Sequence, residues 1–352
     1  MPVTLIVTTL NEASSVTELW QSILAQTRLP NEVIVVDGGS TDTTMILLQN
    51  LSKKTRGFNA KILVKSGNRS VGRNWAIQQA THNLIACTDA GCVLKPDWLE
   101  QLLKVQNQTQ ADVVAGYYAG LAKTSWQAAV IPYALVMPDQ LPQPPAQFLP
   151  ATRSLLLTRA AWQKAGQFNE NLSDNEDYAL AHALIKTGAK LAFAKTAIVF
   201  WHPPQTWLAT AKMFYRFARG DAAAGLWRPK VGLIFLRYLI WLGLGFDWLW
   251  LVFITDSRVN AGAGVDVSVG GNVNGNTSVL SFYLGWILGL SVLSYLGWAI
   301  SKNVRYCRRS ESWDWSWGWL PLLQVTADWA VMTGTLAGIK QRVMSHSPTQ
   351  KI

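Results

Sequence analysis

VVDGGSTD, at residues 35–42, is an apolar run that ends at the carboxylate of Asp37 and breaks at glycine. CTDAGC, at residues 87–92, is a second run of the same kind and ends at Asp89. Either run alone is typical of a buried strand followed by a turn, because Asp-Gly and Gly-Gly pairs are common in loops. In an open parallel sheet, ligands bind outside the carboxyl ends of the strands. Together the two runs therefore predict a nucleotide site at that edge of a sheet.

A strand and a helix precede Asp37. Residues 5–12, LIVTTLNE, form an apolar run that ends in polar side chains. Ser15 and Glu18 have the spacing of a capping box at the start of a helix. The apolar residues around them have helical spacing: Val16, Leu19, Trp20, Ile23 and Leu24. A strand, a helix and a second strand in this order form a parallel crossover unit, which predicts an α/β fold.

Six short segments have the order and spacing found in one known family. They are residues 7–12, 36–42, 72–74, 89–91, 166–170 and 176–180. On these segments the chain resembles the family 2 glycosyltransferases over residues 1–225. The resemblance implies an α/β GT-A fold, in which helices flank a mixed, mostly parallel sheet. It also implies a nucleotide-diphosphate sugar as the donor.

The resemblance places the donor nucleotide between the two acidic runs. It implies that Asp37 accepts hydrogen bonds from the nucleotide base and that Asp89 lies beside the ribose and the metal-bound diphosphate. Further donor contacts are implied for Thr9, Asn11, Glu12 and Arg73. For Arg73, a solvated position at the start of a helix is an alternative explanation.

The metal site departs from the family's pattern at Gly91, where the resemblance implies the second acid of an Asp-x-Asp element. That acid is usually the direct metal ligand. A divalent cation, Mg or Mn, prefers oxygen ligands and can take them from Asp89 and from phosphate. His202, which follows the last apolar run, is a candidate replacement ligand, although a lone histidine is more often structural.

Two acids, Glu176 and Asp177, begin an apolar-periodic segment. Acids in a first helical turn interact favourably with the helix dipole, so helix capping would explain both without a catalytic role. The resemblance implies that this pair is catalytic and that Asp177 is the general base of an inverting transfer. It would take the acceptor hydroxyl proton as the oxygen attacks the anomeric carbon.

Arg216 and Arg219 are candidates for binding the departing diphosphate. They lie in an aromatic segment, FYRFARGD, that is similar to an element following the catalytic domain in membrane-linked family members. The planar guanidinium group suits a diphosphate. A basic amphipathic helix on an anionic membrane surface explains the same pattern, and both interpretations stay open.

Long apolar segments indicate a membrane rather than nucleic acid as the partner of this basic chain, whose formal net charge is +10. Residues 279–300 are uncharged and long enough to cross a hydrocarbon core of roughly 30 Å. Residues 231–255 are also long enough but carry Arg237 and Asp247, and Asp247 is expected to face protein or water. Residues 319–339 are less apolar and could span, re-enter or lie in the interface.

The distribution of basic residues predicts the topology. They are dense after residue 300, at Lys302, Arg305, Arg308 and Arg309. The connection at residues 256–278 has only Arg258 and is expected to be a flexible outer loop. The positive-inside rule therefore predicts a multi-pass protein of the plasma (inner) membrane with a cytoplasmic catalytic domain. Lys340 and Arg342 do not fit a third full crossing.

Two further patterns bear on the carboxyl-terminal half and the acceptor. Tryptophans cluster before residue 320 and are typical of an aromatic membrane belt: Trp313, Trp315, Trp317 and Trp319. Residues 121–150 are rich in Pro, Gln and Ala and interrupt the alternation of strands and helices. We expect an acceptor-side loop there.

These patterns predict a catalytic domain at residues 1–225 and a membrane region at residues 226–352. The predicted activity is inverting transfer of a sugar to a hydroxyl, on a lipid or lipid-linked glycan acceptor. Gly91 leaves open a binding or scaffold protein with a decayed domain, although Asp37, Asp89 and Asp177 are all retained. A polysaccharide synthase is a further alternative, but the chain lacks a Gln-x-x-Arg-Trp motif.

Overall fold

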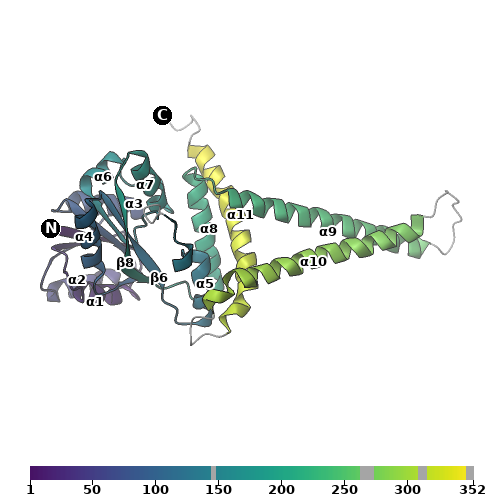
Figure 1. Cartoon of the computed structure of the whole chain (residues 1–352), viewed down its shortest axis with the longest axis horizontal. Coiled ribbons are helices and arrows are strands. Elements are labelled where there is room, and N and C mark those ends of the chain that lie inside the picture. Colours follow the sequence, from purple (N-terminus) through teal and green to yellow (C-terminus); the bar gives the residue numbers. More distant parts are fainter. Residues whose placement is uncertain (144–147, 262–272, 308–314, 346–352) are drawn as a thin grey trace.

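The computed structural model describes residues 1–143, 148–261, 273–307 and 315–345. The chain forms an α/β part followed by four long helices (Figure 1). Within the described residues, the strands make one eight-stranded sheet in the order β3-β2-β1-β4-β7-β6-β8-β5. Their bounds are β1 Val3–Thr9, β2 Glu32–Asp37, β3 Asn59–Val64, β4 Leu84–Asp89, β5 Cys92–Leu94, β6 Val113–Gly120, β7 Leu155–Thr158 and β8 Leu191–Trp201.

The sheet is mixed, as predicted. Strands β3, β2, β1 and β4 are parallel to one another, and β6 is parallel to β8. Strands β7 and β5 run antiparallel to their neighbours. The helices that accompany the sheet are α1 Val16–Leu24, α2 Thr44–Lys54, α3 Arg69–Gln79, α4 Trp98–Thr109, α6 Arg159–Lys164 and α7 Glu176–Lys186.

Helices cover both faces of the sheet, and this explains the continuous apolar runs in the sequence. In β1, Leu5 and Val7 pack into one core cluster and Ile6 into another, since successive side chains of a strand point to opposite faces. The first cluster includes the α1 residues Trp20 and Ile23, each at most 1% exposed. The predicted apolar stripe of α1 is therefore a core face, except at Leu24, which is 42% exposed.

The predicted capping box at the start of α1 does not form. Ser15 is the N-cap residue, but its side chain accepts no backbone hydrogen bond from the helix. Its hydroxyl donates instead to the carboxylate of Glu12. The Ser15 side chain is therefore bonded to the loop that follows β1 and not to the backbone of the helix, as its spacing had predicted.

Residues 121–150 are not only a loop, as the sequence had led us to expect. They contain helix α5, Ser125–Ala134, and a short 3-10 helix, η1 Pro138–Gln140. The side chain of Thr124 caps α5 by accepting a hydrogen bond from the backbone of Gln127. Trp126 of α5 packs with Leu320 and Leu323 of the carboxyl-terminal helices. The segment therefore connects the sheet to those helices.

The carboxyl-terminal helices form two pairs (Figure 1). Helix α8, Trp207–Ala223, lies alongside α11, Leu320–Ser345, next to the α/β part. Helices α9, Pro229–Ala261, and α10, Val273–Cys307, form a hairpin that extends away from it, and a 3-10 helix, η3 Ser316–Trp319, precedes α11. Gly334 and Gly338 of α11 touch the backbone of α8, so the first pair is tightly packed.

Two of these helices are long and apolar enough to cross a membrane, over residues 229–253 of α9 and 279–307 of α10. Helices α9 and α10 as a whole, at residues 229–261 and 273–307, extend beyond the predicted segments at 231–255 and 279–300. Length and composition alone are weak evidence for a membrane. Large apolar side chains on both are exposed, including Phe246 at 68% and Leu293 at 65%.

The charges predicted to be costly in these helices have different surroundings. Arg237 of α9 forms an ion pair with Asp328 of α11, which is 2% exposed. Tyr295 of α10 donates a hydrogen bond to the same carboxylate. Asp247 is exposed on the surface of α9, and none of the described residues covers it. Helix α11 thus supplies the counter-charge for α9.

Some predicted features fall outside the described residues. Arg308, Arg309 and Trp313 do so, as does the centre of the predicted outer loop, residues 262–272. The flanks of that loop are helical, because α9 continues to Ala261 and α10 begins at Val273. The expectation of a loop over all of 256–278 is therefore wrong at its two ends.

Candidate functional site

The carboxyl ends of β1, β2 and β4 lie together at one edge of the sheet. Thr9 of β1 pairs in register with Asp37 of β2, and Thr8 pairs with Asp89 of β4. The two predicted acids therefore flank the end of β1, separated by two strand spacings, about 10 Å. This is the edge at which the sequence predicted a nucleotide.

Asp37 is 1% exposed and accepts four hydrogen bonds. Its Oδ1 accepts from the backbone N–H groups of Gly39 and Ser40, at 2.9 and 2.7 Å. Its Oδ2 accepts from the hydroxyls of Ser40 and Thr9, at 2.6 and 3.0 Å. Burial raises the pKa of Asp37, but these bonds outweigh it and the pKa lies below its usual range. Because they fill the acceptor capacity of the carboxylate, a nucleotide base could bind Asp37 only if a hydroxyl turned away.

The loops after β1 and β2 are joined by the predicted donor-binding residues. Asn11 adopts a left-handed conformation with φ of 56°. Its side-chain oxygen accepts from the backbone of Thr41 at 2.9 Å, and its own N–H donates to Ser40. Glu12 is held by Ser15, and burial raises its pKa. Asn11 therefore holds together the two loops at the carboxyl edge of the sheet, and Glu12 is fixed within the first of them.

Arg73 of α3 joins two of the predicted acids. Its Nη2 donates to Asp89 Oδ1 at 2.8 Å, and its Nη1 donates to Glu176 Oε1. Arg73 is 3% exposed and Glu176 is 2% exposed. Burial alone would lower the pKa of Arg73, but Glu176, Asp89 and Asp177 raise it. The arginine is thus a buried cation and not, as the alternative held, a solvated residue at a helix start.

The two adjacent acids at the start of α7 differ in their surroundings. Burial raises the pKa of Glu176, and Arg73 only partly offsets this effect. Asp177 is half-buried and lines a cavity. Its Oδ1 accepts from the backbone N–H of Tyr178 at 2.8 Å and its Oδ2 from that of Thr152 at 3.4 Å. Both acids line the cavity, and Asp177 is the more exposed of the two.

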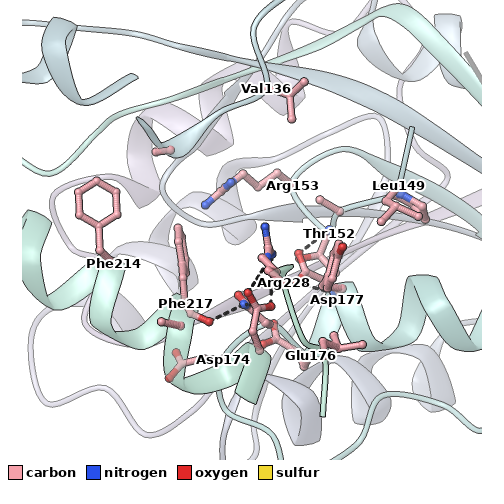
Figure 2. A pocket seen from close by; sticks show the side chains of 18 of the residues that line it. Val136, Leu149, Thr152, Arg153, Asp174, Glu176, Asp177, Phe214, Phe217 and Arg228 are labelled. Atoms are coloured by element: carbon pink, nitrogen blue, oxygen red, sulfur yellow. Dashed lines mark hydrogen bonds and ion pairs between the residues drawn. The ribbon is translucent and has the colours of Figure 1, made fainter. Parts of the chain in front are cut away.

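The cavity has a volume of about 570 Å³ (Figure 2). Its polar end contains Asp89, Asp177, Thr152, Arg153, Arg69 and Arg228. Its other end is mostly apolar, with Phe214 and Phe217 of α8 on one wall. Val231 of α9 and Val331 and Thr335 of α11 complete that end. The cavity therefore extends from the acids to the carboxyl-terminal helices.

Arg216 and Arg219 both form ion pairs with Asp174, a residue that is 5% exposed and precedes α7. Arg216 Nε donates to Asp174 Oδ1 at 2.8 Å, and Arg219 Nη2 donates to Oδ2 at 2.7 Å. Neither arginine is among the described residues that line the cavity. Their position favours holding the loop before Asp177 over binding a diphosphate.

A second set of contacts holds the same loop to α8. Asn175 has a left-handed φ of 56°, and its Nδ2 donates to Phe217 O at 2.7 Å and to Asp221 Oδ1 at 2.8 Å. A Cβ at Gly220 would lie 2.5 Å from Asp174 O, so only glycine allows this approach. Helix α8 therefore positions the residues immediately before Glu176 and Asp177.

Asp174→Ala is expected to lower kcat on the order of 10-fold while leaving the donor KM unchanged, since the loop would shift Asp177 by a fraction of an ångström. Initial rates at varied donor concentration measure both constants. The double variant Arg216→Gln/Arg219→Gln should behave in the same way. A rise in donor KM with unchanged kcat in that variant would instead assign the arginines to the diphosphate.

The residues at Asp89 do not fit a divalent cation held by the protein. Asp89 Oδ1 is bound by Arg73, and Oδ2 lies 3.9 Å from Arg153 Nε. Gly91 offers no side-chain oxygen. His202 lies across from Gly91 when the β5–β8 register is continued by one residue, but its ring nitrogens contact Glu18 at 3.2 Å and Leu121 O at 3.3 Å.

Sequence reasoning missed several residues of the cavity, among them Arg69, Thr152, Arg153 and Arg228. Arg153 lies two residues before the buried strand β7, and a charged residue close to a buried strand was the available signal. Arg228 stacks on Tyr178 at 4.9 Å and pairs with Asp221 at 2.6 Å. These contacts join segments distant in sequence, so spacing could not reveal them.

Residues 4–132 match the model of the family described as glycosyl transferase family 2. Glycosyltransferase AglE of Haloferax volcanii is 23% identical over 249 residues, which are 69% of this chain and 81% of AglE. An uncharacterized glycosyltransferase of Nostoc sp. is 28% identical over 105 residues, and that match covers 30% of this chain and 33% of the relative.

Among solved structures, the mannosyltransferase PcManGT from Pyrobaculum calidifontis, in complex with GDP-Man and Mn²⁺, is similar with a TM-score of 0.52. It is 16% identical, and the alignment covers 94% of this chain and 86% of that one. This similarity confirms the predicted fold, a GT-A-like mixed sheet with flanking helices followed by long apolar helices.

Proposed function

Because this chain is a glycosyltransferase with a family 2 domain at residues 4–132, we propose that it transfers a sugar from a nucleotide-diphosphate donor to a hydroxyl group with inversion. The observation that carries this proposal is the cavity in which Asp177 faces the edge of the sheet that carries Asp89. The donor would bind along that edge, with its nucleotide near Asp37 and its diphosphate near Asp89.

The reaction follows from that placement. The acceptor oxygen attacks the anomeric carbon, and the bond from that carbon to the diphosphate oxygen breaks. The proton of the acceptor hydroxyl passes to the Asp177 carboxylate, and the nucleoside diphosphate leaves with the bonding electrons. Such a transfer has an oxocarbenium-like transition state, so the base must act from the face opposite the diphosphate. No step of the proposal uses a divalent cation, because the donor set at Asp89 does not fit one.

The acceptor we propose is a lipid or a lipid-linked glycan. The polar end of the cavity would hold the reacting hydroxyl, and its apolar end, at Phe214, Val231 and Val331, would hold the lipid portion. Val231 lies in the first turn of α9, one of the two candidate spanning helices, so the cavity reaches the start of that helix. An acceptor anchored in a bilayer could thus reach Asp177 without leaving it.

The proposed location is the plasma (inner) membrane, crossed by α9 and α10, with the catalytic domain in the cytoplasm. Helix α11 packs on α8 and does not form a third crossing in this proposal. A Cβ at Gly225, at the α8–α9 junction, would lie 2.6 Å from Arg342, so the end of α11 lies at the base of the hairpin. Lys302 and Arg305 lie in the last turns of α10, which packs on Leu320 and Leu323 at the start of α11. In this proposal all these basic residues lie on the cytoplasmic side of the membrane, which satisfies the positive-inside rule.

Val331→Trp tests the acceptor proposal by filling the apolar end of the cavity. A panel of nucleotide sugars, screened for slow hydrolysis, first identifies the donor. Transfer to a long-chain lipid acceptor in vesicles is then expected to fall at least ~10-fold, because the tail loses its site. Hydrolysis of the donor and transfer to a short soluble acceptor with the same head group should not change.

The matched control is Leu336→Trp, which places the same side chain on α11 at a position that is already 57% exposed. It should leave transfer to both acceptors unchanged. Equal loss with long and short acceptors in Val331→Trp would remove the lipid portion from this cavity. Absence of hydrolysis with every nucleotide sugar would contradict the donor proposal itself.

A further inference from the structure

Gly91 leaves a gap next to Asp89, at the place where the resemblance implies a second acid. A Cβ built on Gly91 has no atom within 4 Å, so the space beside it is open. Gly91 immediately precedes β5, and Cys92 of that strand pairs in register with Trp201 of β8. Trp201 therefore lies opposite the residue that follows Gly91.

The side chain of Arg153 stacks on Trp201. Its guanidinium group lies 4.8 Å from the ring of Trp201 and 5.6 Å from the ring of Tyr118. Its Nε lies 3.9 Å from Asp89 Oδ2, and its side chain is 19% exposed. Figure 2 shows the side chain reaching into the pocket. Two aromatic rings and one carboxylate thus hold the cation beside Asp89, two residues before Gly91.

The donor groups of this guanidinium are largely unused. In the described part of the chain, no hydrogen-bond acceptor contacts Nη1 or Nη2 of Arg153. Of the other arginines near the acids, Arg73 pairs with Asp89 and Glu176, and Arg228 pairs with Asp221. Arg69 also lines the cavity, but it is exposed and no aromatic ring holds it among the described residues. An arginine held by stacking, with free N–H groups along its edge, is suited to bidentate binding of a phosphate.

We propose that Arg153 binds the diphosphate of the donor at the gap beside Gly91 and that the donor therefore binds without a divalent cation. This inference rests on the proposed function, because it assumes a nucleotide-diphosphate donor along this edge. When the bond to the anomeric carbon breaks, the leaving diphosphate gains one negative charge. Arg153 is already in place to counter that charge, so no group has to reorganise during the reaction.

The charge balance of the site supports an arginine over a cation. Burial raises the pKa of Asp89, but Arg73, Arg153 and Arg69 outweigh it and keep the carboxylate ionised. That single carboxylate is shared between Arg73 and Arg153. A divalent cation would have to displace or approach both guanidinium groups, which repel it. A diphosphate meets no such repulsion.

The test measures binding of nucleoside diphosphates to the full chain in detergent by isothermal titration, in excess chelator and in Mn²⁺. The wild-type chain should bind its preferred nucleoside diphosphate about equally well in both conditions. In chelator, Arg153→Gln should weaken binding by about 10- to 100-fold, the scale of lost charge-assisted hydrogen bonds. Arg153→Lys should fall between them, because an ammonium group keeps the charge and loses the fork.

The matched control is Arg56→Gln, which removes an exposed arginine just before β3, at the opposite edge of the sheet. It should bind as the wild-type chain does. Gly91→Asp is the complementary variant, since the open space beside Gly91 admits a carboxylate. It should make binding stronger in Mn²⁺ than in chelator, because it restores an oxygen ligand beside the diphosphate.

Each outcome bears on a different statement. Binding by the wild-type chain only in Mn²⁺ would overturn the role of Arg153 and leave the proposed function standing. Unchanged binding by Arg153→Gln, or a Gly91→Asp variant that ignores Mn²⁺, would also overturn it. If Arg153→Gln does not fold, the Lys variant and Gly91→Asp decide. Binding of no nucleoside diphosphate in either condition would contradict the proposed function as well.

Discussion

Asp177→Asn is expected to lower the rate of sugar transfer at least ~100-fold, the scale of a lost general base. The amide keeps the shape of the side chain, and its one oxygen can accept from the N–H of either Tyr178 or Thr152, but it cannot take a proton. Affinity for the donor should change little, because the contacts of Asp177 do not include Asp37 or Asp89. Turnover measured with the identified donor and acceptor, together with binding of the nucleoside diphosphate, separates the two effects.

Glu100→Gln is the control for this substitution, since it makes the same chemical change on the surface helix α4. It should leave turnover unchanged. Near wild-type turnover of Asp177→Asn with the natural acceptor would remove Asp177 from the mechanism. Equal losses of turnover and of donor affinity would indicate that Asp177 acts on the donor.

Arg73→Met is expected to lower the free energy of unfolding by about 3–5 kcal/mol, the cost of leaving buried charges without their partner. Glu176, which is 2% exposed, would then lose its paired cation, and Asp89 would keep only the more distant Arg153. Glu176 Oε2 has no hydrogen-bond partner within the described residues, so its carboxylate has little other support. Denaturant unfolding of the variant and the wild-type chain in the same detergent measures the difference.

The double variant Arg73→Met/Glu176→Gln is the control for the buried charge. It should recover a large part of the lost stability, because a neutral amide needs no cation. A single variant that remains within about 1 kcal/mol of the wild-type chain would show that the pair behaves as an exposed ion pair. Loss of stability that the double variant does not recover would trace the effect to packing of Arg73 on Phe168, whose ring lies 5.6 Å away.

The sequence by itself determined the fold class and the sheet edge at which Asp37 and Asp89 lie. Apolar runs that end in Asp37 and Asp89 predict strands and their carboxyl ends, because strand formation and burial follow from a few adjacent residues. The long apolar segments in α9 and α10 could be found in the same way. Their extent could not, since α9 and α10 continue as helix into the segment expected to be a loop.

Only the tertiary structure decided which charges meet. Arg216 and Arg219 were expected near a diphosphate, and their partner is Asp174, 42 and 45 residues away. Arg73 was expected at the donor and also bridges to Glu176, 103 residues away. A guanidinium group pairs with whichever carboxylate the fold brings within reach, and residue type and spacing carry no record of that distance. Asp177 lines the cavity, and its role as the base stays a prediction.

Contacts between distant segments also decide the position of Arg153 and the packing of α11. Arg153 has no motif around it, and its place beside Asp89 arises from the stacking of Trp201 and Tyr118, which belong to two other strands. Helix α11 has a composition that allowed a span, a re-entrant segment or an interfacial helix. Its glycines meet the backbone of α8, and its Asp328 pairs with Arg237, 91 residues away. Local sequence sets which elements form, and the long-range packing of those elements sets which side chains form a site.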